Sequence, residues 1–134
     1  MSSPSNSASA PMPHVVVVED DELVAVAIEE GLSDAGFRVS VASDGAEALA
    51  TLESGAADAL LTDLHMPDMN GCELVEVLRA RWPDLPVVAL TGDQGLRDDT
   101  AGLSSQLSSA GIAVLTKPVE LDRLAEAIRT ALDA

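Results

Sequence analysis

The chain has 134 residues, of which 23 are acidic and seven are basic, so its formal net charge at pH 7 is −16. So acidic a surface repels phosphate backbones and anionic lipids, which argues against direct binding of nucleic acid or membrane by this segment. Hydrophobic residues make up 47% of the chain, aromatic residues 1%, and there is one cysteine, which together favour a single cytoplasmic domain with an aliphatic core and no disulfide.

The first 13 residues contain Ser, Pro and Ala, with no charged side chain and no periodic pattern. This composition predicts a disordered tail over 1–13 and one folded domain over 14–134.

The first half of the folded region alternates short apolar runs with amphipathic segments. In chain order it predicts a strand at 15–18, a helix at 23–32, a strand at 37–42, a helix at 46–52 and a strand at 59–62. The run at 15–18 is unbroken, as in a strand buried on both faces. Either Asp20 or Asp21 can cap the first helix.

The second half repeats the alternation. It predicts a loop at 63–71, a helix around 74–78, a strand at 85–90, a helix at 98–110, a strand at 112–115 and a helix at 121–132. The segment 98–110 is rich in Ser and Gly, so a weak or irregular helix is expected there.

Five strand-then-helix units predict a three-layer α/β/α fold with a five-stranded parallel sheet. Right-handed crossovers and the number of strands favour the flavodoxin-like order 2-1-3-4-5. Ligands of such sheets bind outside the carboxyl ends of the strands, between strands 1 and 3.

Acids, a hydroxyl and an amine follow the predicted strands: Glu19 and Asp20 after the first, Asp63 after the third, Thr91 after the fourth and Lys117 after the fifth. Singly, these residues are ordinary caps, turn residues or surface charges. Acids at the ends of strands 1 and 3 would lie side by side, where two like charges about 4 Å apart repel by roughly 4 kcal/mol at an effective dielectric near 20. A hard dication removes that repulsion, and oxygen ligands favour Mg²⁺, with Mn²⁺ as an alternative.

The charges also suit a phosphoryl group. Glu19, Asp20 and Asp63 carry −3, and Mg²⁺ with Lys117 carries +3, so the site is near neutral and can accept an anion. Asp63 is the carboxylate best placed to act as nucleophile, since a carboxylate can form an acyl phosphate. Thr91 can then donate its hydroxyl to a phosphoryl oxygen.

Four segments resemble the response-regulator receiver domain of two-component signalling. They are VVVVEDD at 15–21, LLTDLHMPDMNG at 60–71, VVALTG at 87–92 and LTKP at 115–118. The resemblance implies a phosphoacceptor at Asp63, Mg²⁺ held by Glu19, Asp20, Asp63 and the backbone carbonyl of His65, a switch hydroxyl at Thr91 and a phosphate-binding amine at Lys117. The side chain of His65 and Asp93, each two residues past a site residue, are expected to tune the lifetime of the phosphorylated state.

The sequence departs from the family at Val114, where an aromatic residue usually precedes the lysine by three positions, and at Val119, where a Phe usually follows Lys-Pro. The stretch from Thr91 to Lys117 is also several residues longer than in the family. Switching is therefore expected to act through Thr91, the surrounding loops or the helix at 98–110.

The resemblance implies a signalling switch rather than an enzyme. Its phosphodonor would be a sensor histidine kinase or a histidine phosphotransfer protein, and its output a downstream protein or effector domain. Two alternatives stay open. One is a receiver-like scaffold that is never phosphorylated, which the missing aromatic favours. The other is an aspartyl-phosphate phosphatase, which lacks its usual second acid because His65 occupies that position.

Overall fold

The computed structural model describes residues 12–55, 57–63, 65–66, 69–91, 111–116 and 119–133, with backbone only at 65–66, 69–73 and 75. Five parallel strands form one sheet in the order β2-β1-β3-β6-β7. Their bounds are β1 His14–Val18, β2 Arg38–Ala42, β3 Ala59–Asp63, β6 Val87–Thr91 and β7 Ala113–Thr116. Numbered along the chain, this is the predicted order 2-1-3-4-5, which is confirmed together with the α/β class.

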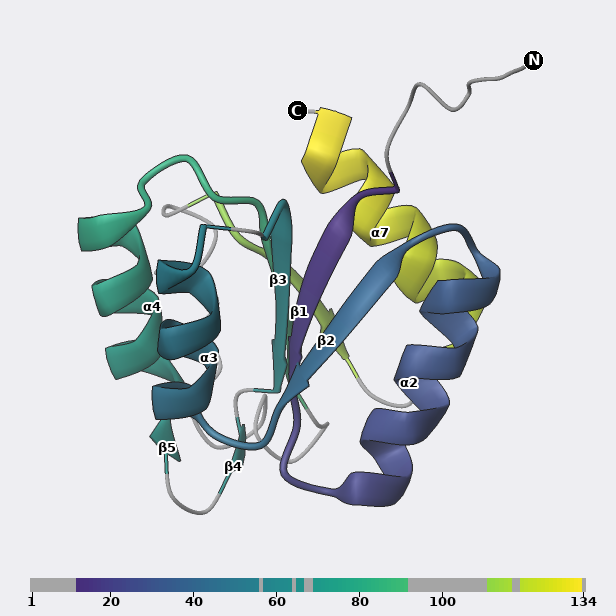
Figure 1. Cartoon of the computed structure of the whole chain (residues 1–134), viewed down its shortest axis with the longest axis horizontal. Helices are drawn as coiled ribbons and strands as arrows, with labels where there is room; N and C mark the ends of the chain where they lie inside the picture. Colours follow the sequence, from purple (N-terminus) through teal and green to yellow (C-terminus); the bar gives the residue numbers. More distant parts are fainter. Residues whose placement is uncertain are drawn as a thin grey trace.

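Two layers of helices cover the sheet (Figure 1). The helices with described bounds are α2 Glu22–Asp34, α3 Gly45–Glu53, α4 Gly71–Arg81 and α7 Leu121–Asp133. Helices α2 and α7 lie on one face of the sheet, and α3 and α4 lie on the other. None of the helices described is long and apolar enough to cross a membrane.

The strand β1 shows why the sheet has two cores. Its valines point alternately to opposite faces. Val15 and Val17 join a cluster with residues of α2 and α7, whereas Val16 and Val18 join a cluster with residues of α3 and α4. All four valines are buried because both faces are covered, as their unbroken apolar run predicts.

Side chains at the helix ends fix where the helices begin. Asp21 caps α2, because its Oδ1 accepts hydrogen bonds from the N–H groups of Leu23 (3.0 Å) and Val24 (3.3 Å). Asp44 caps α3 in the same way, accepting from the N–H of Glu47 at 2.8 Å. The choice between Asp20 and Asp21 that the sequence left open is thus settled in favour of Asp21.

The segment 63–71, expected to be a loop, contains a short antiparallel pair instead. Strands β4 (His65–Met66) and β5 (Met69–Asn70) pair His65 with Asn70 and Met66 with Met69. Two-residue strands are too short to show an alternating pattern, so they could not be predicted from the sequence. The predicted helix at 98–110 and residues 1–11 of the predicted tail lie outside the described residues.

Candidate functional site

The carboxyl end of β1 carries the first acid of the site. The N–H of Glu19 donates to the carbonyl of Ala42 at 3.0 Å, so Glu19 continues the pairing of β1 with β2 by one residue. The side chain is 4% exposed, and its Oε2 accepts a hydrogen bond from the N–H of Asp21 at 3.1 Å. The turn that leads into α2 therefore orients this carboxylate.

The next two acids, Asp20 and Asp21, differ from Glu19 in exposure and from each other in hydrogen bonding. Asp20 is exposed at the end of the strand, so its carboxylate faces solvent. Asp21 is also exposed, but both of its capping hydrogen bonds use its side chain for α2. Glu19 and Asp20 are thus the acids at this end of β1 whose side chains do not cap α2.

The central strand β3 brings Asp63 to the same edge. Val18 of β1 is in register with Thr62 of β3, so the residues that follow them, Glu19 and Asp63, come next in line on neighbouring strands. Asp63 is 5% exposed. A buried carboxylate is costly unless hydrogen bonds or a cation offset the loss of water, so two of them at adjacent strand ends favour a cation between them.

The hydroxyl expected at the site lies one strand further. Asp63 is in register with Leu90 of β6, and Thr91 follows Leu90 as the last residue of that strand, 1% exposed. Thr91 is in register with Thr116, the last residue of β7. Glu19, Asp63 and Thr91 therefore follow the sheet order β1, β3, β6 along its carboxyl edge.

Three predicted features lie partly or wholly outside the described structure. Lys117 and Asp93 are outside the described residues, and only the backbone of His65 is described, in β4. The residue before Lys117 in the sequence is Thr116, the last residue of β7.

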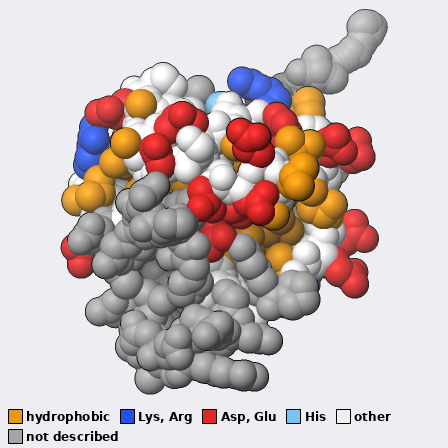
Figure 2. Space-filling view, turned by 90° about the horizontal axis from the view of Figure 1, so that it is seen from below, with side chains coloured by type: hydrophobic (Ala, Val, Ile, Leu, Met, Phe, Trp, Pro, Cys, Tyr) orange, Lys and Arg blue, Asp and Glu red, His pale blue; other side chains and the backbone are white. Residues whose placement is uncertain are grey.

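Seen from the carboxyl ends of the strands, the molecule presents acidic side chains near the middle of the face, beside an apolar strip (Figure 2). The donors are carboxylate oxygens, the ligands that Mg²⁺ prefers. Among the side chains described, no three His, Cys, Asp or Glu lie close enough to hold a metal by themselves. Mg²⁺ commonly uses one or two carboxylates and keeps several waters, a requirement that Glu19 and Asp63 fit.

Comparison with known proteins identifies the family of this chain. The family model of the response regulator receiver domain matches residues 15–129. The chain belongs to this family. The resemblance found in the motifs is thereby confirmed, and the chain is hereafter called the receiver domain.

Its relatives include longer proteins. The receiver domain is 37% identical over 120 residues to the transcriptional regulatory protein PrrA of Mycobacterium tuberculosis. This match covers 90% of this chain and 50% of PrrA. It is 35% identical over 118 residues to the response regulator MprA of Mycobacterium ulcerans. This match covers 88% of this chain and 49% of MprA. The chain thus spans about half the length of the curated relatives it matches.

Solved structures agree in fold. A CheY-like response regulator receiver domain protein from Methanospirillum hungatei JF-1 is 29% identical to this chain, with a TM-score of 0.79. The match covers 91% of this chain and 94% of that one.

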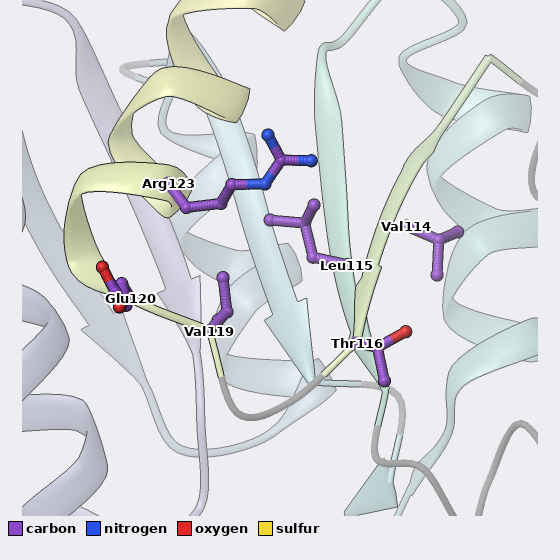
Figure 3. Close-up of a pocket in the computed structure, with 6 residues that line it drawn as sticks. All are labelled: Val114, Leu115, Thr116, Val119, Glu120 and Arg123. Carbon is purple, nitrogen blue, oxygen red and sulfur yellow. The ribbon is translucent and has the colours of Figure 1, made fainter.

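Val114 of the receiver domain occupies the position at which the family usually has an aromatic residue. It lies on β7 in register with Ala89 and packs, half-buried, against the core on the α3 and α4 side. An open cavity of about 480 Å³ is lined by this part of β7 and by residues at the start of α7. In Figure 3, Val114 points to the opposite side of the strand from Leu115 and Arg123.

An apolar groove near the acids at the end of β1 was not predicted from the sequence. Leu23 and Val24 belong to the apolar residues of α2 that recur at helical spacing, but Leu23 is 83% exposed and Val24 is also exposed, while Ala25 is buried. They line a groove of about 590 Å³ between α2 and α7, together with Val119 and Leu121. The apolar stripe of α2 is broader than the surface that it packs against the sheet. This breadth is the feature of the sequence from which an exposed apolar groove could have been predicted.

Proposed function

We propose that this receiver domain is a phosphorylation switch in which Asp63 takes a phosphoryl group from a phosphohistidine partner in the presence of Mg²⁺. The observation that carries the proposal is the register of the sheet. It brings Asp63 to the strand end beside Glu19, with both side chains buried and with Thr91 on the next strand.

Glu19, Asp20, Asp63 and the backbone carbonyl of His65 would hold the cation. Bound there, Mg²⁺ neutralises negative charge on the transferred phosphoryl oxygens. An oxygen of Asp63 attacks the phosphorus in line, an O–P bond forms, and the N–P bond of the phosphohistidine breaks. The departing imidazole retains the electron pair of that bond and takes a proton. Lys117 and the hydroxyl of Thr91 donate hydrogen bonds to the phosphoryl oxygens.

Phosphorylation changes the charge at a buried position and so favours one of two conformations of the domain. In the family the change is coupled to an aromatic residue, but Val114 is too small for that role. We therefore assign the switching to Thr91 and to the chain that follows it. His65 and Asp93 would set how fast water removes the phosphoryl group.

The apolar groove provides a surface for the phosphodonor. Its lining residue Leu23 follows the acidic turn Glu19–Asp21 within two residues, so a protein seated there is next to Asp63. Asp21 and Glu120 flank the groove residues in the sequence and are exposed. The fitting occupant is a helical surface of the phosphohistidine protein, with apolar residues flanked by basic ones.

The donor would be a sensor histidine kinase or a histidine phosphotransfer protein of the cytoplasm. The curated relatives are about twice as long as this chain, which supports an effector domain as the recipient of the signal. A separate downstream protein is the other recipient we propose. As a switch, the domain would be phosphorylated once rather than turn over substrate.

The deciding experiment is incubation with Mg²⁺ and acetyl phosphate, followed by intact-mass measurement. We expect one phosphate adduct in the wild-type domain and none in Asp63→Asn. Turnover of an external phosphate ester without a lasting adduct would favour a phosphatase. Neither adduct nor turnover would favour the scaffold, for which the small side chain at Val114 is the supporting observation.

A further inference from the structure

The apolar groove between α2 and α7 ends at a glycine of α2. Val24 and Ala27 belong to the α2 wall of the groove, and Gly31, four residues after Ala27, is the next residue on that side of the helix. The wall from Val24 to Gly31 is about 10 Å long, since an α-helix rises about 1.5 Å per residue. At its end this wall has no side chain, and α7 comes close to the backbone of α2.

Leu121, the first residue of α7, occupies the space that a side chain at position 31 would need. A Cβ atom on Gly31 would lie 2.5 Å from Cδ1, 2.8 Å from Cδ2 and 2.9 Å from Cγ of Leu121. Cβ atoms essentially never show separations below 3.0 Å. A glycine inside a helix weakens that helix, so its presence calls for a packing reason. The contact with Leu121, between two neighbouring helices (Figure 1), is such a reason.

Leu121 also lines the groove. Its side chain is 39% exposed, so one side of it rests on the backbone of Gly31 and the other faces the groove and solvent. A side chain added at Gly31 would therefore displace Leu121 in one direction, away from α2 and into the groove. The atoms that would clash are at the end of a flexible side chain, which can rotate without unfolding either helix.

The helix α7 itself is held independently of this contact. Its residues Leu124, Ala125 and Ile128 are buried in the core cluster that also contains residues of α2. A side chain at Gly31 would thus move the side chain of Leu121 rather than the helix. Its effect falls on the shape of the groove and not on the position of α7.

We infer that Gly31 is a specificity-determining residue for the phosphodonor. By leaving room for Leu121 against α2, it keeps the end of the groove open, and a larger residue at this position would shorten the groove. The inference rests on the proposed function, because it takes the groove as the surface on which the phosphohistidine protein docks.

The structural consequence is tested by methyl NMR of the unphosphorylated domain. Gly31→Ala should shift the methyl signals of Leu121 and of Leu23, which lines the same groove, and leave those of Val16, on the other face of the sheet, unchanged. Unshifted Leu121 signals would overturn the inference.

The functional consequence is tested with two phosphodonors. One is the histidine kinase of the same genome that phosphorylates the wild-type domain fastest, and the other is acetyl phosphate. With the kinase, Gly31→Ala should raise the KM for the domain several-fold at nearly unchanged kcat, because docking weakens while Asp63 is untouched. With acetyl phosphate, which is too small to need the groove, the rate should stay that of wild type.

Two comparisons separate the groove from a general effect on α2. Ser33→Ala, at an exposed position of the same helix, raises helix propensity without touching Leu121 and should keep the wild-type KM. In a Leu121→Ala background, Gly31→Ala should add nothing further, because the side chain that it displaces is gone.

A KM for Gly31→Ala equal to that of Ser33→Ala would overturn the inference. So would an effect that persists in the Leu121→Ala background, or one that is equally large with acetyl phosphate. If the wild-type domain forms no adduct with acetyl phosphate, the proposed phosphorylation of Asp63 is itself refuted. An adduct together with an unchanged KM refutes the role of Gly31 alone.

Discussion

Three successive acids at the end of β1 have three different environments. Glu19 is buried, Asp20 is exposed, and Asp21 uses its carboxylate to cap α2. The sequence predicted an acidic cluster at this strand end but not which acid caps the helix. That assignment depends on the backbone turn between β1 and α2, which no periodic pattern encodes.

We expect Glu19→Gln to weaken Mg²⁺ binding by on the order of 10-fold or more, because the amide keeps the shape of the side chain but loses its charge. Isothermal titration calorimetry measures this. The control is Asp21→Asn, which also removes one negative charge and still caps the helix, since Asn caps as well as Asp. If both variants weakened Mg²⁺ binding equally, Glu19 would contribute only through the negative charge of the surface and not as a ligand.

A second expectation concerns the lifetime of the phosphorylated state. Replacing both His65 and Asp93 by Ala should change the rate of dephosphorylation several-fold, because these side chains follow Asp63 and Thr91 by two residues, where water would approach the phosphoryl group. The decay of the phosphorylated mass after removal of acetyl phosphate gives the rate. Glu30→Ala, at an exposed position of α2, is the control. A double variant that decays at the wild-type rate contradicts the assignment.

Among the elements, α2 shows what periodicity can and cannot predict. The expected helix at 23–32 lies within the observed Glu22–Asp34. Four of its apolar residues recur at helical spacing, but Ile28 and Leu32 are buried whereas Leu23 and Val24 are exposed. Helical spacing reveals an apolar stripe, but it does not reveal how far along the helix the covering sheet extends.

We expect Leu23→Ser to slow phosphotransfer from the partner while leaving folding almost unchanged. The side chain is largely exposed, so stability should shift by no more than about 0.5 kcal/mol. The donor to use is the histidine kinase of the same genome that phosphorylates the wild-type domain fastest. The rate from that kinase should fall several-fold. Val26→Ser, another exposed apolar residue of α2 that does not line the groove, is the comparison. Equal effects of the two variants would exclude the groove as the docking surface.

At the scale of the whole molecule, the strand order could be derived from the sequence because several independent signals agree. Five apolar runs, helical segments between them and right-handed crossovers leave few arrangements. The strand order and register bring Glu19, Asp63 and Thr91 to one edge. The close packing of Leu121 of α7 against Gly31 of α2 could not be derived, because it depends on the distance between these two helices, which no local pattern specifies.

The net charge and the proposed metal site together predict how the domain responds to cations. Mg²⁺ at about 100-fold above its Kd should stabilise the folded domain by about 2.7 kcal/mol, since it binds the folded state alone. NaCl at matched ionic strength should stabilise less, because it only screens the repulsion among surface charges. Urea unfolding measures both. Equal stabilisation by the two salts would count against a specific site.

The run of four valines in β1 has a consequence for the chain before it folds. Four consecutive β-branched residues are safe at the centre of a covered sheet, but in an unfolded chain such a run is prone to cross-β aggregation. Glu19, Asp20 and Asp21 follow the run immediately and serve as gatekeepers, since like charges stacked in register would repel. Acids that in the native domain cap α2 or are proposed to hold a cation would thus also keep the unfolded chain soluble.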